Sequence, residues 1–71
     1  MKININGVDV DWPDHRPMTY EEVLLLSHER EGASVVCKPA DKSLAGFTIH
    51  HGQSFPPTEG MKINCIMTGN A

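Results

Sequence analysis

Apolar and polar residues alternate along the opening stretch of the chain. Ile3 and Ile5 alternate with asparagines, and aspartates separate the apolar residues of Val8–Trp12. A period of two is typical of a strand with one buried face. The two runs are separated by Asn6-Gly7, a strong hairpin signal because both residues tolerate positive φ. The pattern predicts a β-hairpin whose apolar face must be covered by another element.

The stretch 18–29 is the segment with the period of a helix. Thr19 is placed to be its N-cap, and Glu22 then completes a capping box. The helix is expected to end near Gly32, which can adopt the left-handed C-cap conformation. Leu25 lies among the polar residues of the exposed side. The buried side is expected to carry Tyr20, Val23, Leu24 and Ser27, with Leu26 beside them.

Three further strands are predicted after the helix, at Ser34–Lys38, Gly46–His50 and Met61–Met67. The segment His51–Gly60 is rich in Gly, Pro, Ser and Thr and is predicted to be a loop, with Phe55 plugging the core. Alternation turns one set of side chains inward: Val35, Cys37, Phe47, Ile49, Met61, Ile63, Cys65 and Met67. It turns another set outward: Val36, Lys62, Asn64 and Ile66.

The element order is therefore ββαβββ, which indicates the α+β class. We expect one helix packed on a four- or five-stranded mixed sheet, the β-grasp arrangement. Periodicity predicts the order of the elements along the chain and leaves the order of strands in the sheet open. A single domain is expected over 1–67, followed by a flexible C-terminal tail at 68–71.

Composition narrows the class of function. The net charge is −3, and the six Lys and Arg residues are scattered, which argues against nucleic-acid binding. No apolar run approaches the roughly 20 residues that a membrane span needs. The opening residues do not follow a signal-peptide pattern. A cytoplasmic protein without nucleic-acid or membrane partners is expected.

Neither a metal site nor a disulfide is predicted. Cys37 and Cys65 both fall on inward faces and are expected to be buried thiols that behave as small hydrophobes. No CxxC pair is present for zinc. His50 and His51 are adjacent in a strand, so their side chains point to opposite faces and are expected on the surface.

The sequence also predicts that the protein is not an enzyme. Asp9, Asp11 and Asp14 lie on or near the polar face of the hairpin, where a solvated acidic stripe is expected. Their spacing is not that of an EF-hand loop. The chain has neither a nucleophile elbow nor a glycine-rich phosphate loop, and it has little room for a substrate pocket.

The chain resembles the ubiquitin-like family along its whole length. More narrowly, it is similar to the small bacterial ubiquitin-like proteins related to the multiubiquitin domain. The similarity lies in the opening INGVDVDWP, the helix start MTYEEVL and the ending GMKINCIMTGNA.

The resemblance implies a protein modifier. Such a protein is activated at its C-terminal carboxylate by an E1-like adenylating enzyme that uses ATP. It then passes through an E2-like enzyme to covalent target proteins. In bacteria a processing metallopeptidase often accompanies these enzymes, in gene clusters linked to antiphage defence. No cofactor bound to the chain itself is implied.

The last four residues would form the conjugation tail. Thr68, Gly69, Asn70 and Ala71 are small or permissive, as a tail that threads a narrow channel requires. Familiar modifiers end in two glycines, whereas this chain has only Gly69 there. The bond could therefore form at Ala71, at Asn70 after loss of one residue, or at Gly69 after loss of two.

Candidate partner-binding residues are Val36 and Ile66, which the alternation places outward on the open face of the sheet, with Thr48 near them. Leu25 on the helix is a second candidate, and packing beneath a connector or loop is its alternative. Two other functions fit the same fold. One is a sulfur carrier with a C-terminal thiocarboxylate, and the other is an interaction module that is never conjugated.

Overall fold

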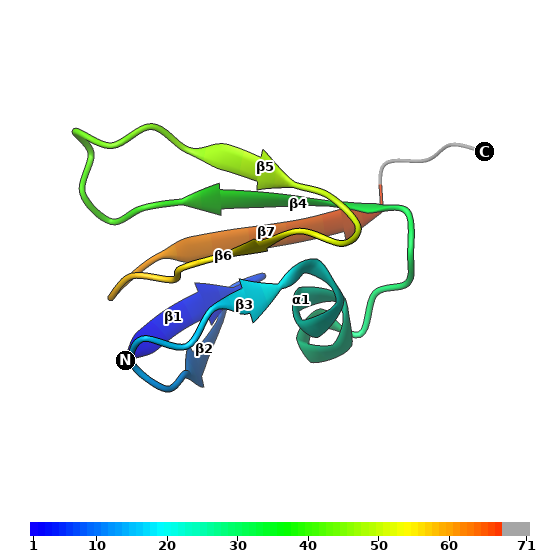
Figure 1. Cartoon of the computed structure of the whole chain (residues 1–71), viewed down its shortest axis with the longest axis horizontal. Coiled ribbons are helices and arrows are strands. Elements are labelled where there is room, and N and C mark those ends of the chain that lie inside the picture. The colour runs from blue at the N-terminus through cyan, green and yellow to red at the C-terminus, as the bar shows by residue number, and fades with distance from the viewer. Residues whose placement is uncertain (68–71) are drawn as a thin grey trace.

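The computed structural model describes residues 1–67, which form one helix and two sheets (Figure 1). The predicted tail at 68–71 lies outside the described residues. In chain order the elements are β1 (Lys2–Ile5), β2 (Val8–Asp11), β3 (Met18–Thr19), α1 (Tyr20–Ser27), β4 (Ala33–Lys38), β5 (Phe47–Ile49), β6 (Ser54–Phe55) and β7 (Lys62–Met67).

The main sheet has five strands in the order β2-β1-β7-β4-β5, from the bottom to the top of Figure 1. β1 and β7 are parallel, and the other neighbours are antiparallel. The last described strand, β7, therefore lies in the centre. The prediction of one helix on a mixed sheet of four or five strands is confirmed, with five.

Asn6 shapes the hairpin and also fastens it to β7. The turn between β1 and β2 has φ of 51° at Asn6 and 87° at Gly7, as the sequence predicts. The Asn6 side-chain amide donates to the Cys65 carbonyl at 3.0 Å, and its oxygen accepts from the Cys65 amide at 2.7 Å. The side chain thus continues the β1–β7 pairing beyond the end of β1.

The N-terminus of α1 has the predicted capping box. The Thr19 hydroxyl accepts from the Glu22 amide at 3.1 Å, and the Glu22 carboxylate accepts from the Thr19 amide at 2.9 Å. Tyr20 then donates from its hydroxyl to the Ala33 carbonyl at 2.7 Å, which ties the helix to β4. Within residues 1–67 no helix is long and apolar enough to cross a membrane.

The predicted helix end is wrong. α1 ends at Ser27, and His28 takes the left-handed conformation at φ 61°. The Glu29 amide donates to the Leu24 carbonyl at 3.0 Å and closes this end. Gly32 also has positive φ, at 101°, but it lies in the turn into β4, where the Ala33 amide donates to the Arg30 carbonyl at 3.3 Å.

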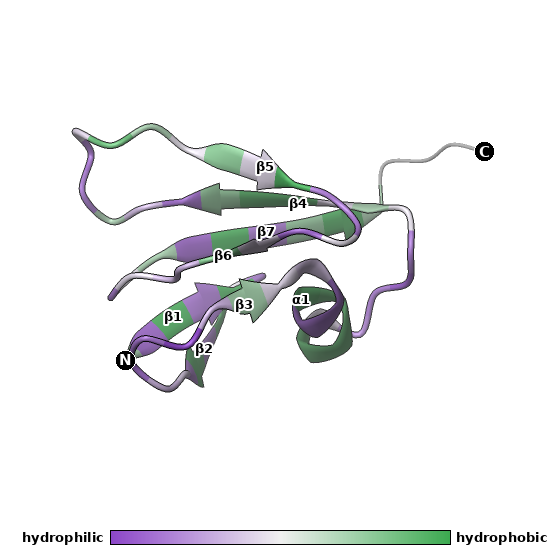
Figure 2. Ribbon diagram, in the orientation of Figure 1, coloured by the Kyte–Doolittle hydropathy of each residue, from purple (hydrophilic) through white to green (hydrophobic). Residues whose placement is uncertain are grey.

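The core lies between the main sheet and the layer formed by α1, β3 and β6. Figure 2 shows hydrophobic and hydrophilic residues alternating along the central strands. α1 contacts β1, β4 and β7. The buried residues are Ile3, Ile5, Trp12, Met18, Tyr20, Val23, Leu24, Ala33, Val35, Cys37, Ile49, Phe55, Met61, Ile63 and Cys65.

Three inward predictions hold only in part. Val8, Phe47 and Met67 have the inward parity of their strands, yet they are 63%, 37% and 39% exposed. Val8 and Phe47 belong to β2 and β5, the outer strands of the main sheet, where no further strand covers them. Phe47 still packs against Phe55, with ring centroids 5.8 Å apart.

The segment predicted as one loop after residue 50 contains a short strand. β6 pairs antiparallel with β3, with Met18 opposite Phe55 and Thr19 opposite Ser54. This second sheet covers the core beside α1, and Met18 is fully buried. The prediction that Phe55 plugs the core is confirmed, since it is 4% exposed.

Replacing the helix cap should destabilise the domain moderately. Thr19→Ala leaves the Glu22 amide without its acceptor, and the expected loss is about 1 kcal/mol of unfolding free energy. Urea unfolding of the purified chain measures it. Thr58→Ala, at an exposed threonine, is the matched control and should unfold like the parent. Equal stability of the two variants would contradict a stabilising role for the cap.

Candidate functional site

Among residues 1–67, no layer of the chain covers one face of the main sheet. We call it the open face, and no residue on it is buried. On the three strands β7, β4 and β5 it consists of Ser34, Val36, Lys38, Thr48, Lys62, Asn64 and Ile66. Because alternate residues of a strand share a face, this set follows from the inward burial of Val35, Cys37, Ile63 and Cys65.

Strand register brings three of the predicted partner-binding residues together. Val36 lies opposite Thr48 on β5 and opposite Asn64 on β7. Ile66 is two residues beyond Asn64 on the same face, opposite Ser34. Ile66 is 56% exposed, as predicted. Val36 was also predicted to point outward, but its side chain is half-buried. Val36 has a strand partner on both sides, whereas the pairing of β7 with β1 ends at Ile63 and leaves Ile66 paired only with β4.

Leu25 does not belong to this group. It lies on α1, in the layer that covers the opposite face of the sheet, and its side chain is 77% exposed. The alternative that it packs beneath a connector or loop is therefore wrong. Leu26 beside it is 40% exposed, so the helix presents two neighbouring leucines to the outside. An exposed pair of this size is common on protein surfaces.

The four residues predicted as the conjugation tail, Thr68, Gly69, Asn70 and Ala71, lie outside the described residues. They follow β7 in the sequence. Ile66, on the open face, is thus two residues before Thr68 in a central strand.

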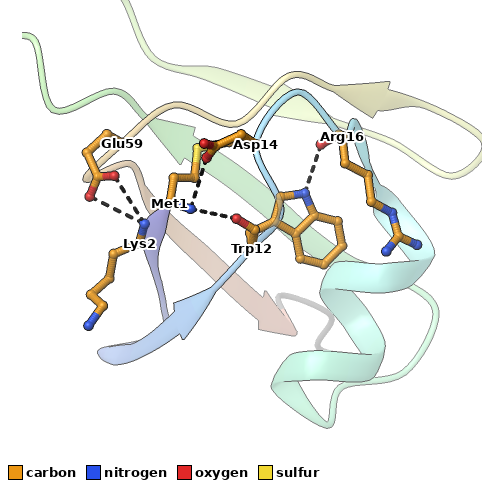
Figure 3. Close-up of polar contacts among 6 residues, drawn as sticks. All are labelled: Met1, Lys2, Trp12, Asp14, Arg16 and Glu59. Carbon is orange, nitrogen blue, oxygen red and sulfur yellow. Dashed lines mark hydrogen bonds and ion pairs between the residues drawn. The ribbon is translucent and has the colours of Figure 1, made fainter.

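A hollow of about 560 Å³ lies where the 14–17 connector meets the segment 56–59. Figure 3 shows its polar contacts. The Met1 ammonium donates to the Trp12 carbonyl at 2.7 Å and to the Asp14 carboxylate at 3.1 Å. The Glu59 carboxylate accepts from the Lys2 amide at 3.2 Å. The N-terminal ammonium and the carboxylates of Asp14 and Glu59 thus bind other parts of the chain, which gives them a structural role.

Trp12 and Arg16 join this region to the helix. The Trp12 indole donates to the Arg16 carbonyl at 2.8 Å, and the Arg16 guanidinium lies 5.0 Å from the centre of the Trp12 ring (Figure 3). Arg16 also pairs with Glu22 at 3.2 Å. The prediction of little room for a pocket is wrong, since the hollow has about 560 Å³. The contacts of Trp12 and Arg16 were not predicted. The signal in the sequence was that Arg16 follows Trp12 by four residues, and this spacing is a weak indication of contact.

Cys37 and Cys65 are buried, as predicted, and both are free thiols in the structure. Burial raises the pKa of Cys37 to about 12, and burial is also the main cause that raises the pKa of Cys65. Both are therefore protonated at neutral pH, and a neutral thiol is a poor nucleophile and metal ligand.

The exposed histidines provide no metal site. His51 lies on the surface, with its Nε2 3.2 Å from the Glu21 carboxylate and 3.7 Å from that of Glu31. Within the described part of the chain, no group of three or more His, Cys, Asp or Glu residues could hold a metal ion.

The raised pKa of Cys37 predicts a loss of stability in alkali. The folded pKa of about 12 lies above the ordinary 9.0, so folding favours the neutral thiol. This contribution is complete below pH 9.0 and is lost as the pH rises toward 12. Urea midpoints across this range should fall more steeply for the parent than for Cys37→Ala. Parallel curves for the two proteins would contradict the assignment.

The open face is therefore the surface on which the predicted partner residues gather, and the tail is its neighbour in sequence. In comparisons with protein-family models, curated proteins and solved structures, the chain gave no match.

Proposed function

We propose that this chain is a ubiquitin-like protein modifier with a β-grasp fold. One observation carries the proposal: a parallel β1–β7 pair lies at the centre of the order β2-β1-β7-β4-β5, with one helix across one face. In this arrangement the last strand is central and the chain continues from it toward the C-terminal carboxylate. The other face stays free for a partner.

The steps of conjugation follow from the low reactivity of the C-terminal carboxylate. A free carboxylate is a poor acyl donor, so an E1-like enzyme first joins it to AMP, with release of pyrophosphate from ATP. An enzyme thiol then displaces AMP, and an E2-like enzyme passes the acyl group to an amine of the target. The tail must enter each active site, and Gly69 permits an extended chain without a side-chain clash.

A non-conjugated interaction module is the second candidate function. The observation that favours it is the open face itself, where Val36 is half-buried and Ile66 is 56% exposed beside Thr48 and Ser34. Such a module needs the face but no reactive carboxylate. Adduct formation separates the two functions, because both predict binding and only the modifier predicts a covalent bond.

Gly69→Trp should abolish conjugation and leave the fold unchanged. The chain is mixed with ATP and with the adenylating and conjugating enzymes that the proposal requires, and adducts are read by intact mass spectrometry. The parent is expected to form adducts. Gly69→Trp should form none, because the indole would collide with the walls of the narrow channel in the enzyme. Its free energy of unfolding should lie within about 0.5 kcal/mol of that of the parent.

Deleting Asn70 and Ala71 identifies the reacting carboxylate. Adducts survive the deletion if Gly69 is the donor and disappear if Asn70 or Ala71 is. If neither the native nor the shortened tail forms an adduct with these enzymes, the modifier function is wrong and the interaction module replaces it.

A further inference from the structure

Two lysines face each other at one end of the open face. Lys38 at the end of β4 is the register partner of Lys62 at the start of β7, and both side chains are exposed. Like charges directly opposite each other on neighbouring strands destabilise a sheet. Among residues 1–67 the cations in ion pairs are the N-terminal ammonium, Arg16 and His51. Neither lysine of the pair has a described carboxylate as a partner.

Asp9, the acidic residue in the same row of the sheet, does not form an ion pair with either lysine. In the same row of the sheet, Lys62 lies opposite Asn4, and Asn4 lies opposite Asp9 on β2. The Asp9 carboxylate accepts from the Asn4 side chain at 3.1 Å. Two strand spacings separate Asp9 from Lys62, about 10 Å, which is roughly one Debye length at physiological salt.

Apolar surface lies at the other end of the same strands. Ile66 is four residues from Lys62 along β7, about 13 Å at the rise of an extended strand. Val36 lies between these ends, two residues from Lys38 on β4 and level with Asn64. The open face thus has a basic end and an apolar end at a fixed spacing.

We propose that the open face binds an extended acidic segment of a partner protein. In the bound segment, the carboxylates lie at Lys38 and Lys62. A branched apolar side chain four residues further along that segment covers Ile66. Charge complementarity of this kind steers association and selects partners. The unfavourable lysine pair becomes favourable only when the acidic segment is present, and such breaks of a local rule are expected at functional sites. The inference rests on the proposed function only in taking the open face as a protein-binding surface.

The probe is a synthetic peptide, acetyl-Glu-Ser-Glu-Ser-Ser-Ser-Val-amide. In an extended chain its two glutamates and its valine lie on one side, and four residues separate the second glutamate from the valine. The peptide is titrated into the ¹⁵N-labelled chain to about 5 mM, a range that covers weak binding, while backbone amide shifts are followed. Saturable shifts are expected at Val36, Asn64 and Ile66. Lys38→Glu and Lys62→Glu should each weaken binding about tenfold. The charge-matched control Lys42→Glu, in the loop between β4 and β5, should change it less than about twofold.

Melting temperature separates lost binding from lost folding. Lys62→Glu removes the repulsion with Lys38 and should melt at or above the parent temperature. A markedly lower melting temperature would overturn the argument from like charge.

Control ligands test the chemistry of the partner. The analogue in which lysine replaces both glutamates should not bind. The proposal is overturned if the acidic peptide gives no saturable shift on the open face, if the basic analogue binds equally well, or if oligothymidylate binds the same face more tightly. None of these assays uses the conjugation enzymes, so failure to form adducts and failure to bind the peptide are separate results.

Discussion

Ile63→Ala should remove a large fraction of the stability of the domain. Ile63 is fully buried at the centre of the main sheet, flanked by Ile5 on β1 and Cys37 on β4. Truncating a buried isoleucine costs about 2–5 kcal/mol, through lost burial and the cavity left behind. A domain of this length has roughly 4–11 kcal/mol in total. We therefore expect the urea midpoint to fall by about 1 M or more.

Ile66→Ala is the matched control, because it makes the same chemical change on the same strand. Ile66 is 56% exposed on the open face, so its truncation loses little burial. Its free energy of unfolding should stay within about 0.5 kcal/mol of that of the parent. Equal effects of the two substitutions would contradict the assignment of the two faces of β7.

Asn6→Ala should cost about 3 kcal/mol or more, far above an ordinary surface substitution. It removes both hydrogen bonds to Cys65 and leaves a partly buried amide and carbonyl without those partners, at about 1–3 kcal/mol for each unsatisfied group. It also places a β-carbon at φ 51°, which adds roughly 1–2 kcal/mol. Urea unfolding gives the total.

Asn6→Gly separates these two contributions. Glycine accepts positive φ without strain, so this variant loses only the hydrogen bonds and should be more stable than Asn6→Ala. Asn6→Asp keeps an acceptor for the Cys65 amide but turns a carboxylate oxygen toward the Cys65 carbonyl, and it should also be destabilised. A stability of Asn6→Gly equal to that of the parent would show that the side chain does not fasten β1 to β7.

Local signals predicted the local structure well. The turn at Asn6-Gly7 and the capping box of Thr19 with Glu22 each depend on residues close in sequence. Inward positions followed from the period of two. The prediction of the helix end was wrong because two residues, His28 and Gly32, both take positive φ. Only the turn into β4 decides which of them ends the helix.

Contacts between distant residues could not be predicted from periodicity. The β3–β6 pair has two residues on each strand, too few for any period to be recognised. Asn6 and Cys65 are 59 residues apart, so the hairpin signal at Asn6 concealed its second role. The candidate site also combines a feature that periodicity predicted with one that it could not predict. Alternation placed Ile66 outward, whereas the opposition of Lys38 and Lys62 depends on the register of β4 with β7.

The measurement that tests the modifier proposal most directly is made on the chain in its own cells. An affinity-tagged chain is recovered under denaturing and reducing conditions, digested and examined by mass spectrometry. The proposal predicts target peptides with the carboxylate of Gly69, Asn70 or Ala71 joined to an amine, a bond that survives reduction. Recovery of the free chain alone, under conditions in which the enzymes are expressed, would contradict it.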